Sequence, residues 1–445
     1  MKRVKPHAGK PRPGRPIHSR PSRTALVEIE KPIYGGAFLS RLDGKATFIP
    51  LTLPAEQVQV RIVEEKRSYV AAEPEQIITP SPNRIAARCP HFGLCGGCSY
   101  QHANYQAQIE LKQEILRETL ARAGVAAPEK IDALSAESWT YRNRIRLAFD
   151  AAGRLGYRGR RSHQIIPIRE CPISAPSLVN AAMAAAEILS ALRNRLMPTE
   201  ISLFCDAAET ALLSTITVQR FTRDAFDTFA ASWKKRAPSL AGIELVRESH
   251  EGKEPTTVAR WGESSIAYHA AGFDYQVENG AFFQVNRWLI DDLVHRVVGS
   301  RTGTLAWDLF AGVGLFARPL TQRFEKVVAV ESAPVATHSL TCNLQGRNAE
   351  TVTTDTLSFL RGHRESRTPD LIVVDPPRAG LGPEITALLS EVAAPALVYA
   401  SCDPSTLARD LKALVTSGYS LASVTLVDLF PQTFHLETLV ELCRS

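Results

Sequence analysis

The pattern of apolar and polar residues divides the chain into segments of different character. Between Thr24 and Pro80, short runs alternate apolar with polar residues and are separated by turn residues such as Gly35, Gly36 and Gly44. Alternation of this kind is typical of half-buried strands, and several such strands with close turns predict a small β-barrel. Barrels of this size often accompany RNA-binding proteins, although the barrel alone identifies no ligand.

The next segment has a helical period. Residues 104–124 carry apolar side chains at Ile109, Leu116 and Leu120 among charged ones, and the run ends at Gly124. This spacing predicts an amphipathic helix, which we expect to pack on the C-terminal domain. From Trp139 to about Tyr275 strand-like and helical runs mix, which predicts an α+β domain.

The C-terminal part repeats strands and helices. From about Phe282, short continuous apolar runs alternate with helical segments, which predicts a mostly parallel sheet covered on both faces. The length of 445 residues suggests about three domains. We therefore predict a multidomain chain, divided into a tail (1–23), a small β-barrel (24–80), a central α+β domain (81–275) and a C-terminal α/β domain (276–445).

Composition narrows the class of protein. The hydrophobic fraction of 44% and the charged fraction of 22% are typical of a globular protein, and no run of about 18 apolar residues occurs. The N-terminus has no apolar core of a secretory signal. These features favour a cytoplasmic protein without a membrane span.

Positive charge is concentrated in two places. Residues 1–23 hold eight Lys or Arg and no acid, against a net charge of +6 for the whole chain. This Pro- and Gly-rich tail predicts a disordered arm able to tether nucleic acid, although a merely solubilising role is the simpler alternative. Between residues 139 and 170, eight arginines face only Asp150 and Glu170, which predicts a binding surface in an ordered region.

A glycine turn predicts the cofactor site. In D-L-F-A-G-V-G (308–314) an apolar run ends at Phe310 and is followed by Gly312 and Gly314, which let a ligand approach the backbone. The next strand ends at Glu331, placed to bind ribose hydroxyls. The third glycine of the dinucleotide fingerprint is missing, which favours S-adenosylmethionine over a nicotinamide dinucleotide. An oxidoreductase remains an alternative.

A cysteine and a glutamate suggest the chemistry. Cys402, in S-C-D-P, follows the apolar run 396–400 and is expected at a strand's carboxyl end, although most single cysteines are buried structural residues, as we interpret Cys342 and Cys443 to be. A thiolate can add to carbon 6 of uracil and so make carbon 5 nucleophilic toward a methyl sulfonium. The proton on carbon 5 must then be removed, and Glu437 is the candidate base, with His435 a residue that could orient it. Cytosine methylation is less favoured, since Arg378 rather than a second cysteine follows D-P-P.

Three cysteines with close spacing predict a metal centre. Cys89, Cys95 and Cys98 form C-x5-C-x2-C, and Cys171 supplies a fourth thiol, with Cys205 as its rival. Such crowding in a cytoplasmic protein favours metal over disulfides. Four thiolates suit zinc or an iron–sulfur cluster, and the spacing does not choose between them.

With these motifs together, the chain resembles the bacterial RNA uracil-5-methyltransferases that act on 23S ribosomal RNA, over residues 24–445. The resemblance implies a TRAM-type barrel, a central domain carrying a 4Fe-4S cluster and a C-terminal Rossmann-like methyltransferase domain. It also implies that Cys402 is the nucleophile and Glu437 the base. The cluster ligands implied are Cys89, Cys95, Cys98 and Cys171.

The resemblance further implies a binding set for S-adenosylmethionine and an RNA partner. The implied cofactor contacts are Gln284, Phe310, Glu331, Asp355 and Asp375. Phe282 is implied to stack on RNA bases, whereas Leu315 stands where the family often has a polar residue, so no contact is assigned to it. We expect a monomer that methylates a uridine of 23S ribosomal RNA. A transfer-RNA uridine, or an inert metal-containing RNA-binding module, is the alternative.

Overall fold

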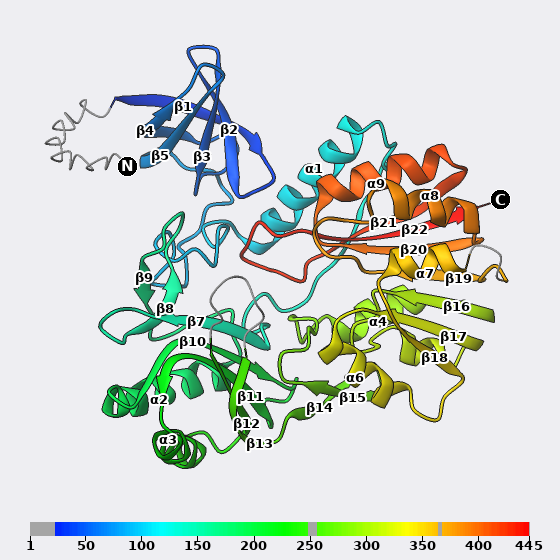
Figure 1. Cartoon of the computed structure of the whole chain (residues 1–445). Coiled ribbons are helices and arrows are strands. Elements are labelled where there is room, and N and C mark those ends of the chain that lie inside the picture. Colours follow the sequence, from blue (N-terminus) through cyan, green and yellow to red (C-terminus); the bar gives the residue numbers. More distant parts are fainter. Residues whose placement is uncertain (1–22, 248–255, 364–366, 445) are drawn as a thin grey trace, which may run out of the picture. The chain divides into compact units, whose positions relative to one another are not determined.

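The computed structural model describes residues 23–247, 256–363 and 367–444 (Figure 1). The basic tail lies outside the described residues. Two compact units are present. The first comprises the described residues up to Lys31 together with Ala37–Ser81, and the second comprises Pro32–Gly36 and Pro82–Ser445.

The first unit is a closed barrel with the strand order β1-β2-β3-β5-β4, in which β1 pairs with β4. Its strands are β1 (Thr24–Pro32), β2 (Ala37–Leu42), β3 (Lys45–Pro50), β4 (Gln57–Glu65) and β5 (Tyr69–Thr79). Asp43 and Gly44 both have positive φ in the β2–β3 hairpin, as a tight primed turn requires. The predicted barrel is confirmed, although the sequence pattern did not reveal β2.

The central part of the second unit is a seven-stranded sheet in the order β13-β12-β11-β10-β7-β8-β9. Its strands are β7 (Arg144–Phe149), β8 (Leu155–Arg158), β9 (Ile165–Pro167), β10 (Leu196–Cys205), β11 (Leu212–Phe221), β12 (Leu240–Arg247) and β13 (Thr256–Gly262). Helices α2 (Pro176–Leu192) and α3 (Arg223–Arg236) share a hydrophobic core with it. The small alanines of α2 let α3 approach closely enough for Trp233 Nε1 to donate to the Ala181 carbonyl at 2.9 Å.

The C-terminal part of the second unit is an eight-stranded sheet in the order β18-β17-β16-β19-β20-β22-β21-β6. The first five strands in this order, from β18 through β16 to β20, are parallel to one another. Strand β22 is antiparallel to both β20 and β21, and β6 is parallel to β21. The strands are β6 (Asp132–Leu134), β16 (Gly303–Leu309), β17 (Phe324–Glu331), β18 (Ala349–Thr353), β19 (Leu371–Val374), β20 (Ala396–Ser401), β21 (Tyr419–Val427) and β22 (Glu437–Arg444). All four residues of β19 are buried, because helices cover both faces of a parallel sheet.

Two hydrophobic cores lie on this sheet. One includes α4 (Ile290–Val298), α5 (Ala317–Leu320), α6 (Pro334–Leu344) and the hairpin of β14 (Ser265–Ala270) and β15 (Phe273–Glu278). The other includes α1 (Tyr105–Arg122), α7 (Thr356–Gly362), α8 (Gly382–Val392) and α9 (Pro404–Thr416). The apolar residues Ile109, Leu116 and Leu120 of α1 thus pack in the core of the C-terminal sheet. In the described parts of the chain, no helix combines the length and apolarity that a membrane crossing needs.

Candidate active site and cysteine pocket

The glycine turn after β16 has the backbone of a ligand-binding loop. Phe310, Gly312 and Gly314 all have positive φ, of 67°, 56° and 91°. A β-carbon at Gly314 would lie 2.8 Å from Leu340 Cδ1, whereas one at Gly312 would meet no atom within 4 Å. Gly314 is therefore required by packing and conformation together, and Gly312 faces open space that a ligand can enter. The non-glycine residue Phe310 in a left-handed conformation marks a strained, functional type of turn.

The predicted cofactor residues lie at the carboxyl ends of four neighbouring strands. Phe310 follows β16, Glu331 ends β17, Asp355 follows β18 and Asp375 follows β19. Glu331 accepts a hydrogen bond from Gly312 N at 2.9 Å, which ties the second strand end to the glycine turn. Asp355 is exposed and caps α7 by accepting from Ser358 N at 2.9 Å. The sheet therefore gathers these residues at one edge, although they are far apart in sequence.

Buried carboxyl groups give this edge its electrostatic character. Burial, together with the charges of the neighbouring acids Asp375 and Glu331, raises the pKa of Asp308 to about 8, and burial raises that of Asp375 to about 7. Gln284 Nε2 donates to Asp375 Oδ2 at 3.3 Å. Such a group of acids suits a positively charged ligand, because a cation offsets their repulsion and their desolvation.

Cys402 and Glu437 are brought together by strand register. Ser401 on β20 pairs with Thr438 on β22, so the next residue along β20 and the preceding residue along β22 lie at the same end of the ladder. Burial raises the pKa of Cys402 to about 12, and the charges of Glu437 and Asp375 add to the effect. Burial, together with the charge of Asp375, raises the pKa of Glu437 well above its ordinary value. A buried thiol and a carboxyl group, both with raised pKa values, therefore lie together at this end of the ladder.

His435 faces an arginine rather than the glutamate. Its Nδ1 accepts a hydrogen bond from Arg378 Nη2 at 3.0 Å. Burial and the positive charges of Arg378 and Lys112 lower the pKa of His435 to about 4, so the ring is neutral near pH 7. The neutral His435 ring therefore holds the guanidinium of Arg378, in the D-P-P-R segment, in place. The sequence pattern did not reveal this contact.

The segment from Asp428 to His435, here called the catalytic loop, is anchored by a buried ion pair. Lys112 of α1 lies 2.5 Å from Asp428 Oδ1, and both side chains are 0% exposed. Lys112 also donates to the Phe430 carbonyl at 3.0 Å, and Tyr105 OH donates to Asp428 Oδ2 at 2.8 Å. Sequence reasoning missed this lysine, because a charge on an amphipathic helix usually faces solvent.

Two further segments hold the catalytic loop. Ser99 N and Tyr100 N both donate to the Gln432 carbonyl at 3.0 Å, and Tyr141 OH donates to the Pro431 carbonyl at the same distance. Ser99 directly follows Cys98, so the cysteine-rich segment is bonded to the loop that leads to Glu437.

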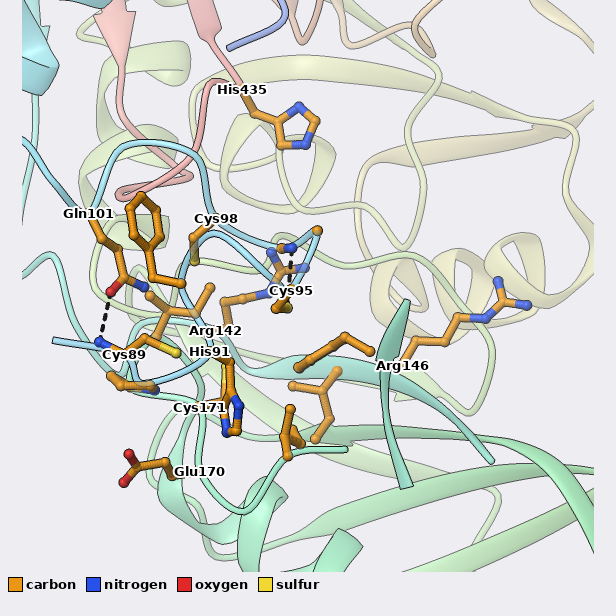
Figure 2. Close-up of a pocket in the computed structure, with 18 residues that line it drawn as sticks. Cys89, His91, Cys95, Cys98, Gln101, Arg142, Arg146, Glu170, Cys171 and His435 are labelled. Carbon is orange, nitrogen blue, oxygen red and sulfur yellow. Dashed lines mark hydrogen bonds between the residues drawn. The ribbon is translucent and has the colours of Figure 1, made fainter. Parts of the chain in front are cut away.

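Cys89, Cys95, Cys98 and Cys171 line one pocket with a cavity of about 250 Å³ (Figure 2). His435 and Arg142 line the same pocket. Gly97 N donates to Cys95 Sγ at 3.3 Å, and Ser174 Oγ donates to Cys171 Sγ at 3.2 Å. The rival fourth thiol, Cys205, is buried in the core of the central sheet instead.

Burial favours the protonated form of three of these thiols, those of Cys89, Cys95 and Cys98. Burial raises the pKa of Cys95 to about 11 and that of Cys98 to about 12, and the neighbouring thiols add to the effect. Cationic iron or zinc would have to displace these protons on binding. Within the described ranges, no group of three His, Cys, Asp or Glu side chains is arranged to hold a metal ion. The four thiols are thus suitable donors for a metal, although no three of them are placed to bind a single ion as the structure stands.

Two expectations from the sequence are wrong, one about the group of arginines and one about Cys443. The eight arginines of residues 139–170 do not form one surface, because Arg144 is directed inward over the Phe204 ring at 4.5 Å, where burial lowers its pKa to about 10. Arg142 lines the cysteine pocket, whereas Arg158, Arg161 and Arg169 are exposed. Cys443 is also exposed rather than a buried structural residue.

In sequence, this chain is similar to known RNA methyltransferases. A family model described as tRNA (Uracil-5-)-methyltransferase matches residues 360–445. The chain is 30% identical to an "Uncharacterized RNA methyltransferase" of Aquifex aeolicus, over 93% of this chain and 97% of that protein. It is also 30% identical to the 23S rRNA (uracil(1939)-C(5))-methyltransferase RlmD of Yersinia enterocolitica, over 96% of each chain.

Among solved structures, the chain is similar to the Pyrococcus abyssi tRNA (uracil-54, C5)-methyltransferase in complex with S-adenosyl-L-homocysteine. The TM-score is 0.76 at 24% identity, and the alignment covers 94% of this chain and 100% of that one. This likeness establishes a shared fold.

Proposed function

This chain belongs to the family of S-adenosylmethionine-dependent RNA uracil-5-methyltransferases, and we propose that its substrate is a specific uridine of 23S ribosomal RNA. The similarity to RlmD over nearly the whole chain supports this target. The observation that carries the chemistry is the Ser401–Thr438 pair, which sets Cys402 beside Glu437.

The reaction starts at the thiol. The Cys402 thiolate forms a bond to carbon 6 of the uracil, and the electron pair of the carbon 5–carbon 6 double bond moves onto the ring as an enolate. S-adenosylmethionine supplies the methyl group, which passes to carbon 5 and leaves S-adenosylhomocysteine. Glu437 then takes the proton from carbon 5, and the sulfur–carbon 6 bond breaks to restore the double bond. The target base has to leave its stack to reach Cys402.

The raised pKa values suit these steps. A carboxylate whose pKa is raised by burial is a stronger base than an ordinary glutamate, which favours proton removal by Glu437. The thiol of Cys402, in contrast, is held in its protonated form by burial and, in addition, by the charges of Glu437 and Asp375. A bound sulfonium cation next to Asp375 would offset that negative charge and favour the thiolate. Gln284, Phe310, Glu331 and Asp355 complete the proposed cofactor site.

Cys89, Cys95, Cys98 and Cys171 would hold a 4Fe-4S cluster. Four thiols around one cavity, with a backbone N–H directed at Cys95 Sγ, support this assignment. Bound there, the cluster would supply rigidity at the segment that carries Ser99 and Tyr100.

A transfer-RNA uridine is the alternative substrate. The matching family model carries a transfer-RNA description, and the similar P. abyssi structure is a transfer-RNA enzyme, although at 24% identity this likeness concerns the fold. Reaction type and site residues would be the same for either RNA.

Two variants test the proposal. With unmodified 23S RNA transcript and S-adenosylmethionine, Glu437→Gln is expected to accumulate a covalent protein–RNA adduct, since the proton on carbon 5 cannot leave. Cys402→Ala is expected to give neither adduct nor 5-methyluridine, as read by denaturing electrophoresis and nucleoside mass spectrometry. Wild-type methylation by Cys402→Ala would refute the mechanism. Methylation of transfer RNA but not of the 23S transcript would refute the target.

A further inference from the structure

Two tryptophans meet at the surface of the second unit. Trp288 lies between β15 and α4 and has 41% of its surface exposed, which is unusual for so large an apolar residue. Its Nε1 donates to the Trp139 carbonyl at 3.1 Å, and Trp139 lies in the connection between β6 and β7. The indole of Trp288 is therefore fixed in orientation while much of it faces solvent.

The backbone below the two rings is also fixed. Arg287 N donates to the Tyr141 carbonyl at 3.0 Å, and Trp288 N donates to Asn286 Oδ1 at 3.1 Å. A side chain on such a support loses little further conformational entropy when a planar ligand stacks on it.

Each ring carries an arginine. The Arg287 guanidinium lies 4.3 Å from the centroid of the Trp288 ring and is held there by Glu209 at 2.5 Å, with 5% of its side chain exposed. The exposed Arg88 lies 5.1 Å from the centroid of the Trp139 ring. Two acids also contact this group: Glu209 pairs with Arg287, and Glu137 accepts from Trp139 N at 3.1 Å. Aromatic faces beside arginines are the composition that single-stranded nucleic acid prefers.

The tryptophan pair is connected to the cofactor edge. Trp288 follows Gln284 by four residues, and Gln284 donates to Asp375. Asn286, between them, donates to the Asp428 and Leu429 carbonyls at 3.4 and 3.3 Å, at the start of the catalytic loop. The surface therefore lies on the segment that joins the cofactor site to the catalytic loop.

We propose that Trp288 and Trp139, with Arg88, form a stacking site for a nucleobase of the substrate RNA that is not the target uridine. This inference rests on the RNA-directed activity of the family. RNA sites that are modified in single-stranded loops present unstacked neighbouring bases, and an indole holds such a base without reading its sequence. The site would thus hold a base near the target while that target occupies the pocket of Cys402.

The test compares Trp288→Ala with Trp288→Phe in the full chain. Binding of a short fluorescently labelled oligouridylate is measured by anisotropy, and binding of S-adenosylhomocysteine by calorimetry. Loss of one base stack predicts roughly fivefold or more weaker oligouridylate binding for Trp288→Ala. Trp288→Phe, which keeps an aromatic face, is expected to bind nearly as the wild type. Affinity for S-adenosylhomocysteine is expected to be unchanged in both, which also shows that the variants are folded.

Val415→Ala, on α9, is the matched control, because Val415 is an apolar residue that is 39% exposed elsewhere on the same unit. Oligouridylate is also expected to quench tryptophan fluorescence in a Trp261→Phe background, and to quench it much less after the further change Trp288→Ala, since Trp233 and Trp307 are buried and Trp139 is then the one partly exposed tryptophan left. Equal oligouridylate binding by wild type and Trp288→Ala would overturn the inference. So would self-association of the free protein that Trp288→Ala abolishes. Failure of the wild type to methylate the 23S transcript would refute the proposed target, but it would not change the oligouridylate binding or the fluorescence quenching that test the stacking site.

Discussion

At the scale of single residues, the candidate site is governed by buried acids. Asp308, Asp375 and Glu437 all have raised pKa values because burial disfavours their charged forms. Cys402 and Glu437 were proposed as nucleophile and base from their sequence motifs alone. The direction of their pKa values could not be found in this way, because it depends on side chains from other strands.

The first prediction concerns the charge that Glu437 exerts on Cys402. Glu437→Gln removes one of the groups that raise the pKa of the thiol, so that pKa falls and more thiolate is present at pH 8. We expect alkylation of Cys402 by iodoacetamide to become severalfold faster, as measured on its peptide by mass spectrometry. Cys443 is exposed and lies at the opposite end of β22, so it serves as the internal control. An unchanged Cys402 rate would mean that Glu437 is uncharged near the thiol.

At the scale of elements, α1 stabilises the catalytic loop of a sheet from which it is remote in sequence. The pairs Lys112–Asp428 and Gln108–Gln432 join the two directly, with Gln432 N donating to Gln108 Oε1 at 2.9 Å. Periodicity predicted the helix, which runs from Tyr105 to Arg122, because its apolar stripe is regular. It did not predict that Lys112 is buried, since one partner of the ion pair lies 316 residues away.

The second prediction is that Lys112→Met strongly destabilises the second unit. The change leaves the Asp428 carboxylate buried without its cation, which costs about 3–5 kcal/mol. Urea unfolding followed by tryptophan fluorescence measures the loss, because Trp307 lies in the same core as α1. Arg223→Ala is the control, because the exposed Arg223–Asp227 pair contributes only about 0.3–0.5 kcal/mol. The double change Lys112→Met, Asp428→Asn is expected to recover much of the stability. A loss no larger than that of the control would contradict the assigned role of the pair.

At the scale of the whole molecule, the cysteine pocket and the catalytic loop are one connected structure. Ser99 and Tyr100 are bonded to Gln432, and His435 lines the pocket beside the four thiols. Three of the four thiols lie in the segment before β7 and the fourth is that of Cys171, so the sequence positions suggest that the proposed cluster would brace the central domain alone. The tertiary contacts would extend such a brace to the catalytic loop.

The third prediction is that loss of the iron–sulfur cluster proposed for the pocket loosens this loop. Purified Cys98→Ser, or protein stripped of iron, is expected to exchange the amide hydrogens of residues 428–435 faster than the wild type, as followed by mass spectrometry. The strands of the barrel are expected to be unchanged. Cys443→Ser controls for the loss of a thiol as such. Wild-type exchange in residues 428–435 of the iron-free protein would show that the pocket does not brace the loop.

The features that the sequence by itself determined are local: each follows from a short pattern or motif. Alternation specified the barrel and short apolar runs specified the parallel sheet, since each signal is contained within about ten consecutive residues. The glycine turn and S-C-D-P, equally short, predicted a cofactor site and a nucleophile at one edge of the sheet. Only the tertiary structure decided that Cys171 rather than Cys205 joins the other thiols and that Arg144 is directed inward. It also decided that Lys112 is buried against Asp428 and that Trp139 meets Trp288. Each of these depends on residues brought together by strand order and by loops that cross between sheets, and no local pattern records such contacts.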